Sequence, residues 1–387
     1  MSDLRRRLER IDVPDEHDAR VRAWQIVRAS FAEREPRARR RAQWRPALVF
    51  AVVTAVVAGA LSSPGRAFID SVREAIGVED ASPALFELPA EGNVLVTSAR
   101  GAWVVQPDGS KRLLGRYREA SWSPFGRYVV VSRANELAAL DPESGDLRWS
   151  LARPAVRHAR WGGSRTDTRI AYLSGTTLRV VSGDGDPDRL LARGVADVAP
   201  AWRPGAGHVL VYASAAGGLR AVEADTGRLR WRAPGIGRVS TLEWSRDGRR
   251  LLVRGPRSLR VLGTDGRLRL DLLGEEAAPV VAAALAPSSR SLAFVQRTAG
   301  RSTLWIIPRL RPDGSAARRV FAGAGRFTDV AWSPDGSWLL LAWRNADQWI
   351  FIRSSGVRRL EAVSSIARQF RAPAFPRVEG WCCAEER

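Results

Sequence analysis

Three residue types that build many active sites are scarce in this chain of 387 residues: histidine, cysteine and lysine. Its three histidines, His17, His158 and His208, are far apart. Its two cysteines, Cys382 and Cys383, are adjacent, which excludes a disulfide framework and the spaced thiolates of a zinc site. Because neighbouring cysteines make a strained pair, we expect free or intermolecular thiols there rather than a structural bridge.

Sequence motifs of common enzymes are also missing. The chain has no Gly-x-Ser-x-Gly elbow, His-Glu-x-x-His zinc motif, Walker loop or Gly-x-Gly-x-x-Gly fingerprint. Asp184, Asp186 and Asp188 have the spacing of the first three calcium ligands of an EF-hand loop. The rest of that pattern fails, because Arg189 and Val195 stand where the loop needs glycine and glutamate. We therefore predict a solvated turn here, and no catalytic, cofactor-binding or metal-binding residue in the chain.

The charge of the chain is carried almost entirely by arginine. The formal net charge is +20, and Lys111 is the only lysine among 61 basic residues. This bias indicates a GC-rich genome, and the arginines are scattered rather than gathered on one element as in a phosphate-binding surface. We therefore do not expect nucleic-acid binding. With 45% hydrophobic residues, the chain can bury a substantial core, and its length suits one large domain with appendages.

One long apolar run lies near the amino terminus. Residues 46–65 contain no ionisable group, and about 20 apolar residues are needed to cross roughly 30 Å of hydrocarbon. An arginine-rich block precedes this run, and such flanks stay in the cytoplasm. The pattern predicts a single-pass membrane protein with a cytoplasmic amino terminus and with everything after about residue 66 outside the cytoplasm. A cleaved signal peptide and a buried core helix are the alternatives.

The segments that flank the predicted span are short. Residues 1–45 predict two small helices followed by the basic block, and the face of the second helix includes Val21, Trp24 and Phe31. This face packs on the other helix, lies on the membrane or binds a cytoplasmic protein. Residues 66–89 predict a juxtamembrane helix and a linker.

A turn followed by an apolar strand recurs through the rest of the chain. Its fullest copy is Trp-Ser-Pro-Asp-Gly at 332–336, where proline presets the turn and aspartate and glycine tolerate its tight backbone. Other copies, some of them degraded, follow one another at intervals of 39 to 47 residues. They begin at Trp122, Trp161, Trp202, Trp244 and Leu285. A period near forty with several short strands per unit is typical of a β-propeller.

The repeats predict an all-β propeller at residues 90–387. Counting the units gives seven blades, with six or eight as the margin. The tail, residues 366–381, ends in Trp381, which lies 49 residues after the last full motif. We expect this tail to add the missing strand to the first unit, which would close the ring and remove exposed sheet edges.

Two kinds of repeat carry a family resemblance. The turn at 332–336 and its strand resemble the WD-repeat-like units of TolB-type propellers. Residues 137–149 and 219–231 resemble the Ala-x-Asp-x-x-Thr-Gly-x-x-x-Trp repeat of quinoprotein-like propellers. The resemblance covers residues 90–381 and implies a propeller fold, which serves enzymes and binding scaffolds alike. In quinoproteins the repeats also frame a cofactor with metal ligands and an acidic base, and no such set is identifiable here.

Taken together, these features favour a non-enzymatic, membrane-anchored propeller that is an extracytoplasmic binding or sensing scaffold without a cofactor. Its expected partners are the lipid bilayer at residues 46–65, a protein or wall-associated ligand on the propeller, and a cytoplasmic protein on the amino-terminal helices. The alternatives are a quinoprotein-like extracytoplasmic enzyme and an anti-sigma-factor-like regulator, whose layout of helical head, single span and outer domain this chain resembles. We expect ligand-facing differences at the degraded repeats that begin at Trp161 and Leu285.

Overall fold

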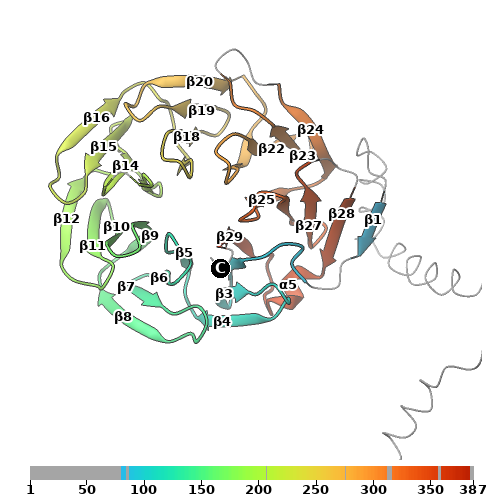
Figure 1. Ribbon diagram of the computed structural model, residues 1–387, viewed down its shortest axis with the longest axis horizontal. Coiled ribbons are helices and arrows are strands. Elements are labelled where there is room, and N and C mark those ends of the chain that lie inside the picture. The colour runs from blue at the N-terminus through green and yellow to red at the C-terminus, as the bar shows by residue number, and fades with distance from the viewer. Residues whose placement is uncertain are drawn as a thin grey trace, which may run out of the picture. The chain divides into compact units, whose positions relative to one another are not determined.

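The computed structural model describes residues 80–83, 87–205, 207–274, 276–311, 316–355 and 359–383. They form a ring of seven blades, each with four antiparallel strands, which confirms the predicted all-β, seven-bladed propeller (Figure 1). The predicted helices within residues 1–45, the predicted span at 46–65 and the predicted juxtamembrane helix lie outside the described residues. Within the described ranges, no helix is long and apolar enough to cross a membrane.

Each blade has one strand at the centre of the ring and its last strand at the rim (Figure 1). From the centre outward, blade 1 contains β29 (Arg377–Cys382), β2 (Asn93–Ser98), β3 (Gly101–Val105) and β4 (Lys111–Gly115). Blade 2 contains β5 (Glu119–Trp122), β6 (Val129–Arg133), β7 (Glu136–Leu140) and β8 (Leu147–Ala152). Blade 3 contains β9 (Val156–Gly163), β10 (Thr168–Ser174), β11 (Thr177–Ser182) and β12 (Asp188–Arg193). Blade 4 contains β13 (Ala201–Trp202), β14 (Val209–Ala213), β15 (Leu219–Glu223) and β16 (Leu229–Ala233).

The remaining three blades follow the same order. Blade 5 contains β17 (Thr241–Trp244), β18 (Leu251–Arg254), β19 (Leu259–Leu262) and β20 (Leu268–Leu273). Blade 6 contains β21 (Val280–Leu285), β22 (Leu292–Thr298), β23 (Arg301–Ile307) and β24 (Arg318–Ala324). Blade 7 contains β25 (Phe327–Trp332), β26 (Trp338–Trp343), β27 (Gln348–Arg353) and β28 (Arg359–Ser364). The short helix α5 (Ile366–Gln369) lies between β28 and β29 along the chain.

The repeated Trp-Ser-Pro-Asp-Gly sequence forms the turn between the first and second strands of a blade. In blade 7 the amide of Gly336 donates to the carbonyl of Ser333 (2.9 Å), and Gly336 has a φ of 72°, which glycine adopts without strain. The carboxylate of Asp335 accepts from the amide of Ser337 (3.0 Å) and the hydroxyl of Ser333 (2.5 Å). The turn thus reverses the chain, and the apolar run after it becomes the buried strand β26.

Most of the tryptophans at the start of a motif lie at or near the end of an innermost strand and belong to the core. Trp161, Trp202, Trp244, Trp332 and Trp381 are all buried. Nε1 of Trp202 donates to the Arg160 carbonyl of blade 3 (2.8 Å). Likewise, Nε1 of Trp332 donates to the Ala284 carbonyl of blade 6 (2.9 Å). These tryptophans therefore hold neighbouring blades together, as their repeated position predicts.

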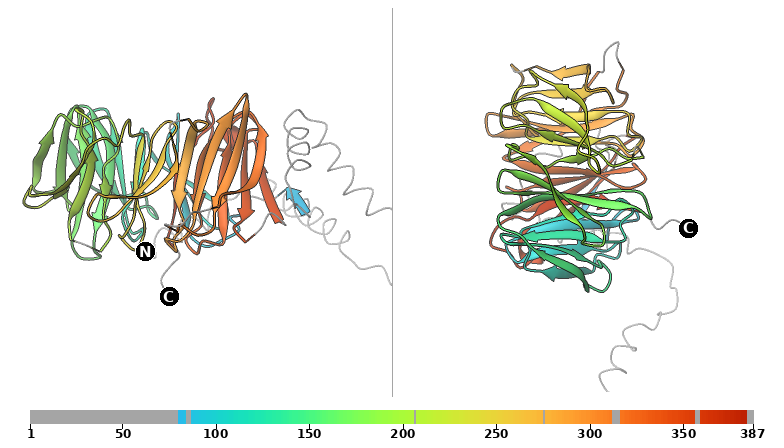
Figure 2. Two further views of the ribbon diagram at one scale, coloured as in Figure 1. Left: turned by 90° about the horizontal axis from the view of Figure 1, so that it is seen from above. Right: turned by 90° about the vertical axis from the view of Figure 1, so that its left-hand side faces the viewer.

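The last strand closes the ring. β29 pairs with β2 in antiparallel register, with Trp381 opposite Val94. The Trp381 ring also meets the Phe351 ring of blade 7 edge-on, with centres 5.8 Å apart. Figure 2 shows the ring from the side, with the strands of the blades running between its two faces. The predicted contribution of the tail to the first blade is confirmed.

The expectation of free or intermolecular thiols at the end of this strand is wrong. Cys382 and Cys383 form a disulfide with each other. Directly after β29 the backbone enters the left-handed region at Cys383 (φ 56°), which lets two consecutive side chains meet on one side of the chain. The pair packs against Gly126 in the turn of blade 2, where a Cβ would lie 3.0 Å from Cys383 Sγ.

One strand has no clear signal in the sequence. Residues Asp80–Pro83, within the predicted linker, form β1, which pairs in parallel with β28 at the rim of blade 7. This pairing covers the outer edge of that blade and fixes this part of the linker to the ring.

Removal of β29 tests the closure of the ring. Truncation of the full-length chain after Pro376 removes this strand and buried Trp381. The free energy of unfolding should fall by at least about 3–5 kcal/mol, and calorimetry should show a broad, less cooperative transition. Truncation after Cys383, which keeps β29, is the matched control and should melt like the intact chain. A sharp, unshifted transition without β29 would rule out closure as a source of stability.

Candidate binding groove between blades 2 and 3

In blades 2 to 7, two turns of each blade lie on the same face of the ring, because adjacent strands of a blade are antiparallel. They are the turn after the first strand and the turn between the third and fourth strands. In blade 2 these are residues 123–128 and 141–146, and in blade 3 they are residues 164–167 and 183–187. We refer to this side of the ring as the turn face.

A groove of about 500 Å³ opens on the turn face between blades 2 and 3. Aromatic side chains and arginines dominate its walls. The aromatic residues are Phe125, Tyr128, Trp149 and Trp161, and the arginines are Arg127, Arg148 and Arg165. Trp161 and Arg165 come from blade 3, and the other five come from blade 2. The first of the two degraded repeats therefore forms part of one wall.

The aromatic floor of the groove is fixed by packing. Tyr128 stacks on Trp161, with ring centres 5.9 Å apart and an angle of 16° between the planes. Trp149 donates its Nε1–H to the Gly183 carbonyl (2.9 Å). Its ring also packs against Gly185, where a Cβ would come within 2.9 Å of the indole. The rings are thus held in place before any ligand arrives.

The guanidinium groups lie over these rings. Arg127 and Arg148 are 5.3 and 5.5 Å from the ring centre of Tyr128. Arg165 is 5.0 Å from the ring centre of Phe125. Stacking occupies the flat face of a guanidinium and leaves its N–H edge for an acceptor. Within the part of the chain that the structure describes, neither Arg127 nor Arg148 makes an ion pair.

Asp184 is the one acidic side chain among the described residues that line the groove. A hydrogen bond from the Ser182 hydroxyl, the largest effect on this carboxyl, lowers the pKa of Asp184 below its usual value. Asp184 is therefore ionised at neutral pH. The blade 2 wall of the groove is positive, whereas the blade 3 wall carries both Arg165 and Asp184.

The indole of Trp161 differs from those of two equivalent tryptophans. Trp202 and Trp332 donate to a neighbouring blade, but Nε1 of Trp161, like that of Trp244, is buried with no partner among the described residues.

The glycine at position 162 of the degraded Trp-Gly-Gly sequence is explained by packing. At Gly162 a Cβ would come within 2.1 Å of the Trp202 side chain, so this position excludes any larger residue.

A second groove of about 370 Å³ lies on the turn face between blades 5 and 6. Leu310, from the other degraded repeat, contributes to it. Two of its three arginines are already used by the ring, since Arg250 donates to the Ser289 carbonyl and Arg269 pairs with Asp265 (2.7 Å), and the exposed Arg249 lies in the same turn as Asp247. The groove between blades 2 and 3 therefore offers the less compensated positive charge.

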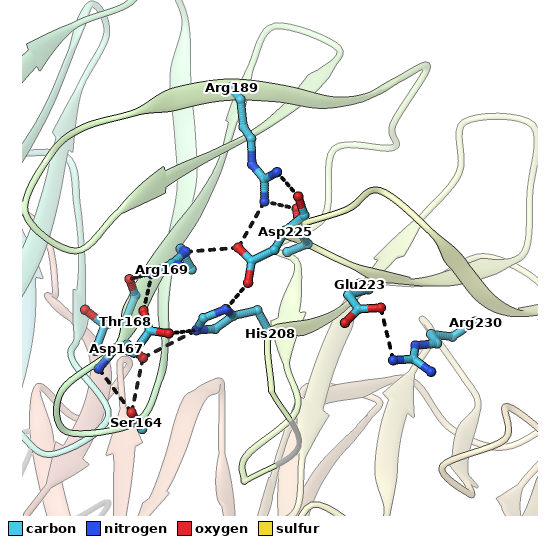
Figure 3. Close-up of polar contacts among 10 residues, drawn as sticks. Ser164, Asp167, Thr168, Arg169, Arg189, His208, Glu223, Asp225 and Arg230 are labelled. Carbon is cyan, nitrogen blue, oxygen red and sulfur yellow. Dashed lines mark hydrogen bonds and ion pairs between the residues drawn. The ribbon is translucent and has the colours of Figure 1, made fainter.

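A polar network ties blade 3 to blade 4 (Figure 3). The His208 ring contacts the carboxylate of Asp225 through Nδ1 and the carbonyl of Asp167 through Nε2 (3.4 Å). Asp225 Oδ1 also accepts from Arg169 Nε and Arg189 Nη2, each at 3.1 Å. Burial opposes ionisation of Asp225, but contacts with His208 and then Arg169 hold its pKa below the usual value. The network uses its charges internally and acts as a structural tie.

The three aspartates with calcium-like spacing are not brought together. Asp188 pairs with Arg153 (2.7 Å) and Arg179 (2.8 Å), whereas the other two are exposed in the turn that precedes β12. The Tyr172 hydroxyl donates to Asp188 (2.9 Å), and burial, followed by this neighbour, raises the pKa of Tyr172 to about 12. No group of three or more His, Cys, Asp or Glu side chains within the described ranges could hold a metal ion.

Two carboxyl groups on innermost strands are largely enclosed by the blades. Glu243 on β17 accepts from the amide of Leu285 (3.3 Å), and burial raises its pKa to about 8. Oδ2 of Asp329 on β25 has no partner among the described residues, and burial raises the pKa of Asp329 to about 6. Neither group lines a groove on the turn face.

Comparison with solved structures identifies WD40-type neighbours. The chain is similar to the β-propeller domain of Cps50 (Swd1) from Myceliophteria thermophila, with a TM-score of 0.53 and 14% identity over 68% of this chain and 95% of that chain. A chain in a structure of a mitotic checkpoint complex has a TM-score of 0.51 and 19% identity, and the match covers 64% of this chain and 76% of that chain. KlHsv2 with loop 6CD replaced by a Gly-Ser linker has a TM-score of 0.52 and 14% identity, and the match covers 70% of this chain and 93% of that chain. No protein-family model and no curated protein matches the chain, so the comparisons show the fold alone.

Substitution of Glu243, measured at two pH values, tests whether its carboxyl group is enclosed by the blades. Its folded pKa of about 8 lies above the reference value of 4.5, so its stabilising contribution is full below pH 4.5 and is lost as the pH rises through 8. Glu243→Gln should raise Tm by about 2–4 °C at pH 8.5 and by less than about 1 °C at pH 5. Scanning calorimetry at both pH values measures this difference. Glu143→Gln, at an exposed position, should leave the Tm unchanged at both pH 8.5 and pH 5. An equal gain at both pH values would contradict the enclosure of Glu243.

Proposed function

We propose that this protein is a non-enzymatic binding scaffold, anchored in the cell membrane with its propeller outside the cytoplasm. The groove between blades 2 and 3 is the observation that carries this proposal. It combines a fixed aromatic floor with Arg127 and Arg148, which lack ion-pair partners among the described residues. A concave, largely aromatic site with a few convergent polar groups is the usual form of a binding site.

The turn of blade 2 departs from the repeat in a way that supports binding. Phe125 stands where blade 7 has Asp335, whose carboxylate accepts from Ser333 and Ser337. Phenylalanine cannot make these hydrogen bonds, and 43% of its surface is exposed beside Arg165. An exposed aromatic ring next to an arginine stabilises the turn little, but both residue types are enriched at the energetic centres of interfaces.

A protein is the partner class that we favour. Tryptophan, tyrosine, phenylalanine and arginine, which line this groove, are the residues enriched in protein interfaces. One propeller of similar fold comes from a structure described as a mitotic checkpoint complex, in which it is part of an assembly. That likeness supports a role in protein assembly for this chain without naming its partner.

The anchor in this proposal is the apolar run at residues 46–65, with the arginine block before it on the cytoplasmic side. The disulfide between Cys382 and Cys383 supports the outer location, because disulfides persist mainly in oxidising compartments. β1 provides a fixed point where the linker meets the rim of blade 7. The predicted helices within residues 1–45 would then offer their apolar face to a cytoplasmic protein.

Thiol labelling tests the orientation with the two native cysteines. In spheroplasts, a membrane-impermeant maleimide should leave the chain unlabelled until an impermeant phosphine reduces the disulfide, and should then label it. Ser2→Cys in a Cys382→Ser, Cys383→Ser background should become labelled only after lysis. Labelling of Ser2→Cys before lysis, or of the native cysteines only after lysis, would show that the proposed orientation is wrong.

Site-specific crosslinking tests the binding role of the groove. A photoreactive amino acid at Phe125 in the membrane-embedded, full-length chain should crosslink to a distinct protein. Leu229 on β16 is a matched control, because its exposed fraction of 42% equals that of Phe125 within one per cent. The same adduct from both positions, or no adduct from Phe125, would count against a protein-binding groove.

A further inference from the structure

We propose that the groove between blades 2 and 3 binds an acidic peptide segment in which two carboxylates flank an aromatic or apolar side chain. This proposal rests on the binding role proposed above and assigns the chemistry of the ligand. The two carboxylates would meet Arg127 and Arg148, and the side chain between them would lie on the Tyr128–Trp161 floor.

The donors on the blade 2 wall are Arg127 and Arg148. Arg127 and Arg148 both lie within 5.5 Å of the ring centre of Tyr128, so two positive charges are gathered at one aromatic ring. Each guanidinium carbon lies over the ring, and no described carboxylate pairs with either group. A carboxylate matches the edge of a guanidinium with two parallel hydrogen bonds. The wall is therefore suited to two acidic side chains placed about one residue apart.

The floor and the size of the groove suit a short peptide segment. Tyr128, which stacks on the buried Trp161, gives an apolar surface beside the two arginines, and the exposed Phe125 adds to it. A volume of about 500 Å³ accommodates a short peptide segment rather than a folded domain. An aromatic or aliphatic side chain between two acidic residues would cover this surface.

The charge of the blade 3 wall distinguishes a peptide from a phosphate polymer as the ligand. Asp184 is ionised on the blade 3 wall, opposite the arginines of blade 2. A polymer with a charge on every unit would bring one of its phosphates close to this carboxylate and be repelled. A peptide can place an amide, a hydroxyl or a basic side chain at that point. The mixed charge of the groove thus favours spaced carboxylates over uniform negative charge.

The test uses the full-length chain in detergent and a fluorescein-labelled probe peptide, Glu-Asp-Phe-Asp-Glu, followed by anisotropy. The peptide should bind, and binding should weaken as salt rises. The matched peptide Gln-Asn-Phe-Asn-Gln should bind at least about tenfold more weakly, because each lost charge-assisted contact contributes of the order of a tenfold change in Kd. Polyphosphate at equal charge concentration should displace the probe less well than the unlabelled acidic peptide does.

Arginine variants test whether the acidic peptide binds in the groove. Arg127→Gln combined with Arg148→Gln should weaken probe binding by at least about tenfold, and the corresponding double lysine variant should fall between it and the unaltered chain. Arg246→Gln combined with Arg249→Gln removes the same charge from exposed positions in the turn of blade 5, and should change the Kd less than about twofold. All four arginines are exposed, so the Tm of each variant should match that of the unaltered chain.

Three results would overturn the assignment. They are equal binding of the acidic and amide peptides, an unchanged Kd after loss of Arg127 and Arg148, and stronger displacement by polyphosphate. If the acidic peptide fails while Phe125 still gives a specific crosslink in membranes, the binding role stands and this ligand chemistry is wrong. If the peptide binds in the groove but Phe125 gives no crosslink, the ligand chemistry stands and the protein-binding role is wrong.

Discussion

The pairing of β29 with β2 is the constraint on which the rest of the structure depends. A blade buries its apolar faces only against two neighbours, so an open arc would leave a face of blade 1 and a face of blade 7 in water. Trp381 fills this junction through its contact with Phe351. Because the ring is closed, blades 2 and 3 cannot separate freely, and the groove between them keeps its shape. The disulfide against Gly126 adds a contact between the closing strand and the blade 2 wall.

Under the proposed binding role, stability and binding are divided between different copies of one repeated turn. In blade 7 the carboxylate of Asp335 satisfies the turn, and the blade carries the largest buried aromatic side chains, Trp343 and Trp349. In blade 2 the same position is Phe125, which is exposed. In blade 3 the tryptophan is followed by Gly-Gly, and glycine is required at position 162 because the Trp202 side chain occupies the space beside it. Two of the copies that deviate from the repeat therefore lie side by side, and the groove lies between them.

The sequence allowed the fold to be predicted because the same signal recurs about every forty residues. The seven blades, the closing tail and the buried tryptophans all follow from that period. The disulfide could not be predicted, since it depends on the left-handed backbone at Cys383. β1 was missed because Asp80–Pro83 has weak strand propensity and pairs with a segment almost three hundred residues away. The groove arginines were hidden because arginine is abundant everywhere in this chain, and only the junction of two blades brings Arg127 and Arg148 to Trp161.

The central claim is that the turn face of blades 2 and 3 is the binding surface of this propeller. Hydrogen–deuterium exchange of the full-length chain, with and without the acidic peptide, tests it most directly. The account predicts slower exchange at residues 123–128 and 161–168 on addition of the peptide, and unchanged exchange in the blade 5 turn at residues 245–250. Protection in the blade 5 turn, or equal protection around the whole ring, would contradict it.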